Sequence, residues 1–285
     1  MSKTSFGGNT LPTADEKLTA LKHLLKEMES VLIAFSGGVD STFLLQVAYD
    51  TLRDNVLAVT AGSATYPQAE FDEACALAAG LGVKHLCITT DELADERFAQ
   101  NPPERCYYCK QELFSKLRQI AFKNGLLWVL DGANADDTGD FRPGIKAGRE
   151  LGVRSPLLEA GLTKQEIREL SRRLGLPTWD KPNMACLSSR FPYGHRITPA
   201  KLAQIEQAEA FLKARGFREV RVRHHGHIAR IEVPSRDIPV LTVSPFREEL
   251  LQNMKNLGFA YITVDLAGFR SGSMNEVLSE ENKSF

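Results

Sequence analysis

The sequence has no excess of charge of either sign and no long apolar run. Its 285 residues include 35 basic and 36 acidic side chains, a formal net charge of −1, so no overall field attracts the protein to nucleic acid or to an anionic membrane. No stretch approaches the ~20 apolar residues of a membrane-spanning helix. The opening MSKTSFGGNT lacks the apolar core of a secretion signal. We therefore expect a cytoplasmic protein with neither nucleic acid nor membrane as a partner.

Cysteine is scarce, and the odd count argues against a disulfide framework. The five cysteines stand at Cys75, Cys87, Cys106, Cys109 and Cys186, without the even number and regular spacing of such frameworks. Cys75 falls in a helical pattern and Cys87 in the apolar run HLCITT, so both are expected to be small buried hydrophobes. The other three remain for chemistry or metal binding.

Strand and helix patterns alternate through the first half of the chain. The apolar segments VLIAF, VLAVT, HLCITT and LLWVLDG are separated by helical patterns, among them residues 67–82 and 110–124. Such an alternation predicts an α/β fold, a parallel twisted sheet with helices on both faces and ligands at the carboxyl ends of its strands. Residues 133–153 are rich in Gly, Asp and Arg and show no sustained period, which predicts a long functional loop.

A second, proline-containing loop over residues 176–198 separates this region from a small α+β unit with the strand patterns EVRVR and IARIEV. We predict a nucleotide-binding domain over residues 1–180, an active-site loop and linker over 181–197, and a small α+β domain over 198–285 for substrate binding or oligomerisation. The tail from residue 271 is expected to fray.

The loop SGGVDS follows the first predicted strand and opens a helix. Such a loop directs free N–H groups and the positive end of the helix dipole at one point, where an anion binds. Gly37 and Gly38 allow a phosphate to approach the backbone closely, and Ser36 and Ser41 add hydroxyl donors. The Gly-Lys-Ser/Thr of the ordinary nucleotide P-loop is missing. SGGVDS resembles the signature of the PP-loop ATP pyrophosphatases, and this resemblance implies adenylation of a substrate oxygen with release of pyrophosphate.

The segment GANADD follows the fourth predicted strand and should lie at the same edge of the sheet. In PP-loop enzymes this loop helps to shape the nucleotide and metal site, which implies roles for Gly132 and Asn134. Carboxylate oxygens suit Mg²⁺ held against pyrophosphate. The candidate ligands are Asp40 together with Asp136, Asp137 or Asp140, and the sequence does not rank those three. Arg142 and Arg149 are phosphate-binding candidates, although loop arginines are more often simply exposed.

A cysteine in the second loop is the candidate reacting group. Cys186 lies in NMACLSSRFPYG near Lys181 and Arg190, and neighbouring cations lower the pKa of a thiol. A thiolate there would attack an acyl-adenylate and form a thioester.

The segment ACLSSRFPYG, taken with SGGVDS and DFRPG…AGRELGVRSPL, resembles the LarE family, the sulfur transferases that build the nickel-pincer nucleotide cofactor. The likeness spans roughly residues 18–275. It implies a pyridinium dicarboxylate mononucleotide substrate, whose carboxylates are adenylated and converted to thiocarboxylates, and a homo-oligomer. In single-cysteine members the cysteine matching Cys186 gives up its own sulfur and becomes dehydroalanine.

The segment RCYYCK places Cys106 and Cys109 two residues apart. Such a pair can chelate a metal such as zinc, act as a dithiol, or supply two of three ligands to an iron-sulfur cluster. Some members of the family resemble this chain in carrying three cysteines, at positions matching Cys106, Cys109 and Cys186, which hold a 4Fe-4S cluster. The open iron of that cluster could deliver hydrosulfide, from free sulfide or a donor protein. We favour the cluster over sacrifice of Cys186.

Basic residues of the small unit are candidates for the substrate phosphate. Arg221 and Arg223 share one face of the strand pattern EVRVR, and Arg230 and Glu232 share a face of the next, because side chains alternate along a strand. Arginine is well suited to phosphate, and the pocket of the family includes basic residues and a glutamate in this region. Arg270 is a further candidate.

Two other functions are compatible with these motifs. One is a PP-loop ligase or tRNA thiolase that forms AMP but serves another acceptor, although no basic stripe or aromatic RNA platform supports the tRNA version. The other is a nucleotide-binding redox sensor that turns nothing over.

Overall fold

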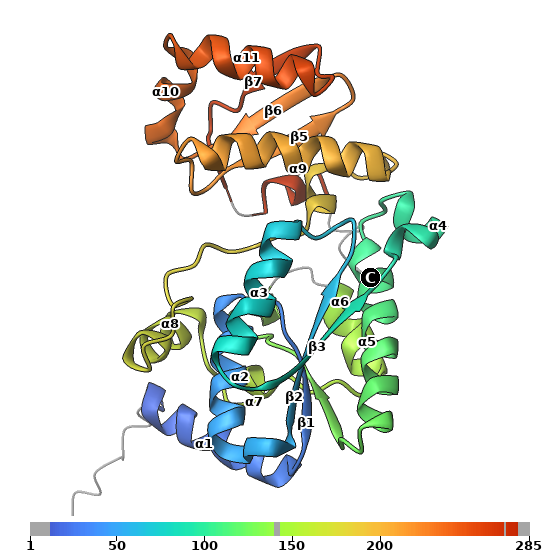
Figure 1. Cartoon of the computed structure of the whole chain (residues 1–285), viewed down its shortest axis with the longest axis vertical. Coiled ribbons are helices and arrows are strands. Elements are labelled where there is room, and N and C mark those ends of the chain that lie inside the picture. Colours follow the sequence, from blue (N-terminus) through green and yellow to red (C-terminus); the bar gives the residue numbers. More distant parts are fainter. Residues whose placement is uncertain (1–11, 140–142, 271, 279–285) are drawn as a thin grey trace, which may run out of the picture.

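The computed structural model describes residues 12–139, 143–270 and 272–278. Two sheets organise these residues (Figure 1): a four-stranded parallel sheet in the order β3-β2-β1-β4 and a three-stranded sheet in the order β5-β6-β7. The predicted α/β class, with a small C-terminal sheet added, is confirmed. The proposed domain boundaries, 1–180, 181–197 and 198–285, stay a prediction.

The parallel sheet is covered by helices on both faces. Successive residues of β1 point to opposite faces, so Val31 and Ile33 join the core on the α1, α2, α3 and α8 side, whereas Leu32 packs with Phe114 and Leu117 of α5. The elements of this part are β1 (Val31–Ala34), β2 (Val56–Gly62), β3 (Lys84–Thr89), β4 (Trp128–Leu130), α1 (Ala14–Met28), α2 (Val39–Leu52), α3 (Gln68–Gly80), α4 (Glu96–Ala99), α5 (Arg105–Lys123), α6 (Pro143–Glu150), α7 (Pro156–Glu159) and α8 (Lys164–Arg173), with the 3₁₀ turns η1 (Arg53–Asn55), η2 (Glu92–Ala94), η3 (Ala135–Gly139) and η4 (Leu187–Arg190).

The small sheet lies beyond the carboxyl ends of the parallel strands, with α9 between the two parts (Figure 1). Strands β5 and β6 form an antiparallel hairpin, whose turn needs the positive φ of Gly226 (68°), and β7 pairs parallel to β6. The elements of this part are β5 (Arg221–His225), β6 (Ile228–Glu232), β7 (Tyr261–Val264), α9 (Pro199–Ala214), α10 (Ile238–Thr242) and α11 (Phe246–Asn256), with η5 (Ser235–Asp237) and η6 (Ser273–Asn275).

Two loop predictions are corrected by the structure. The second half of the predicted long loop is helix α6, and α5 begins at Arg105 rather than near residue 110, so RCYYCK is helical. Helix α6 was not predicted because it packs on α5 through small residues. A Cβ placed on Gly148 would lie 3.2 Å from the Phe114 ring. Close approach of α6 to α5 therefore needs glycine at this position, and a helix of only 8 residues leaves little room for a hydrophobic period to be recognised in the sequence.

Two burial predictions are also wrong. Cys87 is exposed and Cys75 only half-buried, because β3 is the edge strand and its partner helix α3 covers it incompletely. Within the tail, Ser273 is buried and its hydroxyl contacts Glu232 and Arg223, and the expected fraying stays a prediction.

No helix within the described residues is long and apolar enough to cross a membrane.

Candidate active site

The loop after β1 holds a conformation that glycine permits. Gly37 has φ +63°, and a Cβ there would lie 2.9 Å from the Cβ of Ala74 on α3. The Ser41 hydroxyl accepts the Ser36 N–H at 3.3 Å, and the Tyr66 hydroxyl donates to the Ser36 carbonyl at 2.8 Å. Helix α2 then begins directly after Gly38, where its first N–H groups have no intrahelical partner. The loop is therefore braced from two sides and offers backbone donors to an anion.

The loop after β4 packs directly on this cradle, because β4 is the neighbour of β1 in the sheet. A Cβ on Gly132 would lie 3.2 Å from the Ser41 nitrogen and 3.4 Å from the Asp40 Cβ. Lys164, at the start of α8, forms an ion pair with Asp40. The other carboxylate oxygen of Asp40 is buried without a hydrogen-bond partner. Burial raises the pKa of Asp40, Lys164 opposes that shift, and the nearby charge of Asp137 adds to it.

The two acidic residues at 136 and 137, in the loop after β4, have different hydrogen-bond partners. Asp136 accepts the N–H of Lys164 at 2.9 Å and so caps α8, whereas Asp137 accepts the N–H of Asn134 at 3.0 Å and faces the Asp40 side. The Asn134 side chain is buried and accepts the Asp136 N–H at 3.0 Å. Two further candidates, Asp140 and Arg142, lie outside the described residues, and Arg149 is exposed on α6.

Three thiols lie near the start of α5, close enough for their charges to interact. Cys106 and Cys109 lie one turn apart on the helix, and the charges of Cys106 and Cys186 both act on Cys109. Cys109 packs against the apolar cluster that contains Leu187, the neighbour of Cys186. Burial raises the pKa of the Cys109 thiol well above its usual range, and the Glu92 carboxylate adds to that effect.

A buried cation beside these thiols is Arg105, which the sequence reasoning missed. Its side chain is 5 % exposed, its guanidinium lies over the Tyr193 ring at 4.9 Å, and its Nε is buried without a hydrogen-bond partner. Burial by itself would lower the pKa of Arg105, but the charges of Cys106 and Cys186 outweigh it and raise that pKa. The available signal was its position immediately before Cys106.

The two cations expected beside Cys186 have other partners. Lys181 lies 3.1 and 2.9 Å from carboxylates of Glu70 and Glu73 on α3. Arg190 forms a buried ion pair with Glu209 at 2.8 Å and donates to the Cys186 carbonyl at 3.0 Å. Arg190 therefore holds the backbone at Cys186 in place, and its charge is balanced by Glu209.

The segment around Cys186, residues 183–187, lies over the phosphate loop, which is the SGGVDS loop at residues 36–41. The Leu187 N–H donates to the Thr65 carbonyl at 2.8 Å, and the Met184 methyl carbon is 3.9 Å from a Cβ placed on Gly38. Next to this contact is a pocket of about 270 Å³, whose wall includes Tyr66 and Met184. Its basic lining residues are Lys181, Arg190, Lys213, Arg218 and Arg221.

The predicted phosphate-binding residues of the small sheet are divided between this pocket and a buried network. Arg221 lines the pocket, donates to the Asn183 carbonyl at 2.9 Å, and has its pKa lowered to about 10 by burial and by Arg190. Arg223 instead pairs with the fully buried Glu232 at 2.6 Å, which Arg230 also contacts at 2.9 Å. The Ser273 hydroxyl contacts Arg223 and Glu232 of this network.

Arg270 is placed apart from the pocket lining. Its guanidinium pairs with Glu276 at 3.1 Å, within the part of the tail that the structure describes.

Comparisons with known proteins agree with this geometry. Residues 16–122 match the NAD synthase family model. A pyridinium-3,5-bisthiocarboxylic acid mononucleotide synthase of Lactiplantibacillus plantarum is 44 % identical over 271 residues, which cover 95 % of this chain and 98 % of that protein. The chain belongs to the LarE family. It is thus an ATP-dependent sulfurtransferase.

Two further proteins are similar to the chain over most of its length. An uncharacterized protein of Synechocystis sp. is 45 % identical over 266 residues, 93 % of this chain and 99 % of its own length. A glutamine-hydrolyzing GMP synthase component of Halobacterium salinarum is 23 % identical over 266 residues, 80 % of this chain and 84 % of that protein.

Proposed function

We propose that this LarE protein adenylates the carboxylates of a pyridinium dicarboxylate mononucleotide and converts them to thiocarboxylates, with sulfur supplied through a 4Fe-4S cluster held by Cys106, Cys109 and Cys186. The observation that carries the proposal is that Cys109 lies close to both Cys106 and Cys186, while the segment around Cys186 covers the phosphate loop. The name of the Lactiplantibacillus plantarum relative supports the same product.

In the first half-reaction the substrate carboxylate attacks the α phosphorus of ATP, the bond between the α and β phosphates breaks, and pyrophosphate leaves. Ser36, Gly37, Gly38 and Ser41 would bind the departing pyrophosphate at the start of α2, where the helix dipole favours negative charge. Lys164 would neutralise part of that charge once ATP competes for its ion pair with Asp40.

Magnesium fits the neighbouring carboxylates. Asp40 has a buried oxygen without a partner, and Asp137 lies close enough for its charge to act on Asp40. Oxygen ligands of this kind are those that Mg²⁺ prefers, completed by water and phosphate oxygens. Asp136 fits less well, because its carboxylate caps α8.

The three thiols fit an iron-sulfur cluster better than a single ion. The three sulfurs do not all lie within 4.8 Å of one another, which is wide for the ligands of one ion, and a cluster spreads its thiolate ligands over several irons. Arg105 adds the second observation, because a buried guanidinium with an unpartnered Nε needs a nearby anion. Three thiolates around a cluster would supply that negative charge.

In the second half-reaction hydrosulfide attacks the adenylated carboxyl carbon, AMP leaves, and one proton is released. When bound, the cluster would supply the sulfur at this step. The residues of the chain would hold the acceptor near it: Met184 and Tyr66 line the pocket, and Arg221 offers its guanidinium to the mononucleotide phosphate. Arg223 and Glu232 would support that wall through their buried ion pair rather than touch the phosphate.

The proposal is tested by anaerobic reconstitution with iron and sulfide, followed by incubation with ATP, Mg²⁺ and the mononucleotide. We expect AMP, pyrophosphate and a thiocarboxylated product in several equivalents per protein, with the protein mass unchanged. A loss of about 34 Da from the protein, the mass of hydrogen sulfide, would instead show that Cys186 is consumed. Formation of AMP without a thiocarboxylate would indicate a different PP-loop ligase, and no turnover at all would favour a sensor.

Matched variants sharpen this test. Cys106→Ser with Cys109→Ser should abolish multiple turnover but leave adenylation intact, because the phosphate loop, the Mg²⁺ ligands and the pocket residues that AMP transfer uses are unchanged. We further propose that the protein is cytoplasmic and forms a homo-oligomer. Light scattering of the purified protein can check the oligomeric state.

A further inference from the structure

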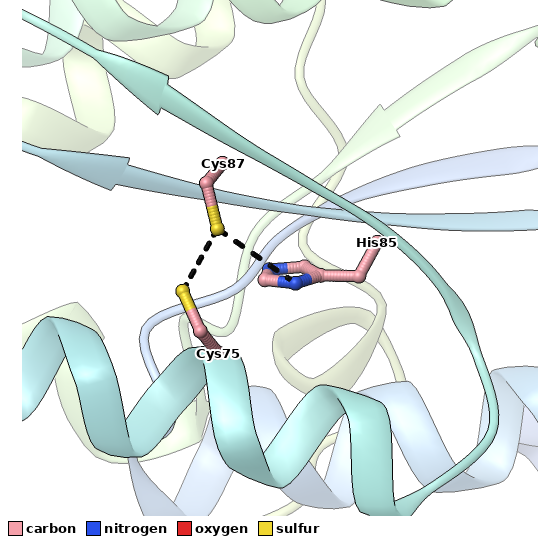
Figure 2. A group of neighbouring side chains, drawn as sticks. All are labelled: Cys75, His85 and Cys87. Carbon is pink, nitrogen blue, oxygen red and sulfur yellow. Dashed lines mark hydrogen bonds between the residues drawn. The ribbon is translucent and has the colours of Figure 1, made fainter.

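A second group of soft ligands lies outside the proposed active site. Cys75, His85 and Cys87 each offer one ligand atom, and these atoms lie within 4.8 Å of one another (Figure 2). His85 and Cys87 are two residues apart on β3, so they share the face of the strand that α3 covers, and Cys75 faces them from that helix. We propose that these three residues bind a soft divalent cation, for which Zn²⁺ is the probe.

The distances suit tetrahedral coordination after small shifts. With Zn–S near 2.3 Å and Zn–N near 2.0–2.1 Å, a tetrahedral site sets its sulfurs about 3.8 Å apart and its nitrogen about 3.6 Å from each sulfur. The Cys75 and Cys87 sulfurs are 2.8 Å apart, and the Cys87 sulfur is 4.0 Å from His85 Nδ1. Each of these two edges is thus within about 1 Å of the value that the metal requires.

The histidine already has the support that metal-binding histidines need. Its Nε2 lies 2.8 Å from the Thr60 hydroxyl on the neighbouring strand β2, which leaves Nδ1 directed toward Cys87. A hydrogen bond to the second ring nitrogen fixes the tautomer and orientation of a ligating imidazole. The edge of the His85 ring also packs on Phe35 at 6.2 Å between centroids. Two contacts therefore hold the ring in place before any ion binds.

The site has an open position. Cys87 is exposed, so a water or a small thiol can complete the coordination as a fourth ligand. The site lies close to the phosphate loop, because Cys75 follows Ala74, the residue against which Gly37 packs. A bound ion would fasten α3 to the edge strand directly behind the phosphate loop.

The test must separate this site from the three proposed cluster ligands. The full-length chain with Cys106→Ser, Cys109→Ser and Cys186→Ser keeps only Cys75 and Cys87, and its fold is checked by circular dichroism. Under anaerobic, reducing conditions we expect this background to bind one equivalent of Zn²⁺. Co²⁺ should give the absorption of a tetrahedral thiolate complex, with charge-transfer bands from two sulfurs.

Further substitutions in the same background assign the ligands. Cys87→Ser should remove stoichiometric binding, and Thr60→Val, which keeps the shape of the side chain, should weaken Zn²⁺ binding by about 10–100-fold through loss of the support to His85. His23→Asn, at an exposed histidine on α1, is the control and should change nothing. The proposal is overturned if the background and its Cys87→Ser variant bind Zn²⁺ equally. It is also overturned if mass spectrometry of the reduced sample finds the two thiols joined as a disulfide.

Discussion

Replacing Gly37 with alanine isolates the contact that shapes the phosphate loop. The backbone there has φ +63°, which costs a residue with a Cβ about 1–2 kcal/mol. The new Cβ would also lie 2.9 Å from the Ala74 Cβ and 3.0 Å from its Cα, atoms of a helix that cannot rotate away. Overpacking of this kind typically costs about 1–3 kcal/mol more. We expect Gly37→Ala to lower the free energy of unfolding by about 2–5 kcal/mol.

Gly125→Ala is the matched control, because Gly125 has φ +67° with no atom within 4 Å of the new Cβ. It should cost only the backbone strain and leave ATP affinity unchanged. Denaturant unfolding measures the stability of both variants, and ATP titration of pyrophosphate release measures KM. We expect Gly37→Ala to raise the KM for ATP at least tenfold, since relief of the clash moves the loop. Equal stability and equal KM in the two variants would refute the packing argument.

Three further results are expected. Arg105→Met should weaken anaerobic iron binding at least tenfold in an iron-content assay, yet leave the melting temperature of the metal-free protein unchanged or higher, because a buried cation whose Nε has no hydrogen-bond partner is removed; a lower melting temperature with normal iron would contradict its role. Glu209→Gln should cost about 3–5 kcal/mol in denaturant unfolding by stranding Arg190. Burial alone would raise the pKa of Glu209, but Arg190 holds it below its usual 4.5. The pair therefore stabilises the wild type above pH 4.5 and less as pH falls through the lowered pKa, so the variant should lose its disadvantage in acid. Asp137→Asn should raise the Mg²⁺ concentration for half-maximal pyrophosphate release at least tenfold, whereas Asp136→Asn should alter stability by about 1 kcal/mol through the cap; the reverse order would reassign the metal ligand.

Local patterns predicted the parallel sheet and the phosphate loop well. Four apolar segments separated by helices leave few arrangements other than a covered parallel sheet. SGGVDS directly after the first strand places an anion cradle at the sheet edge by connectivity alone. Helix α6 was missed because its contact with α5 depends on glycine, and glycine carries no hydrophobic signal.

The candidate site was harder to predict because charge pairing depends on distant residues. Lys181 and Arg190 are close to Cys186 in sequence, yet their charges are balanced by Glu73 and Glu209. A single sequence cannot show which carboxylate a cation will reach. The same limit applies to Arg223, whose partner Glu232 is known only from the strand register.

The order of residues along the chain was enough to establish the fold class, the nucleotide loop and the family likeness, because those depend on local spacing and short connections. Three-dimensional packing decided which groups meet. It brought Arg105 to the thiols, left Cys87 exposed on an edge strand, and set His85 beside two sulfurs. These contacts depend on how the helices pack on the sheet. That packing is determined by burial and charge pairing between residues far apart in the sequence.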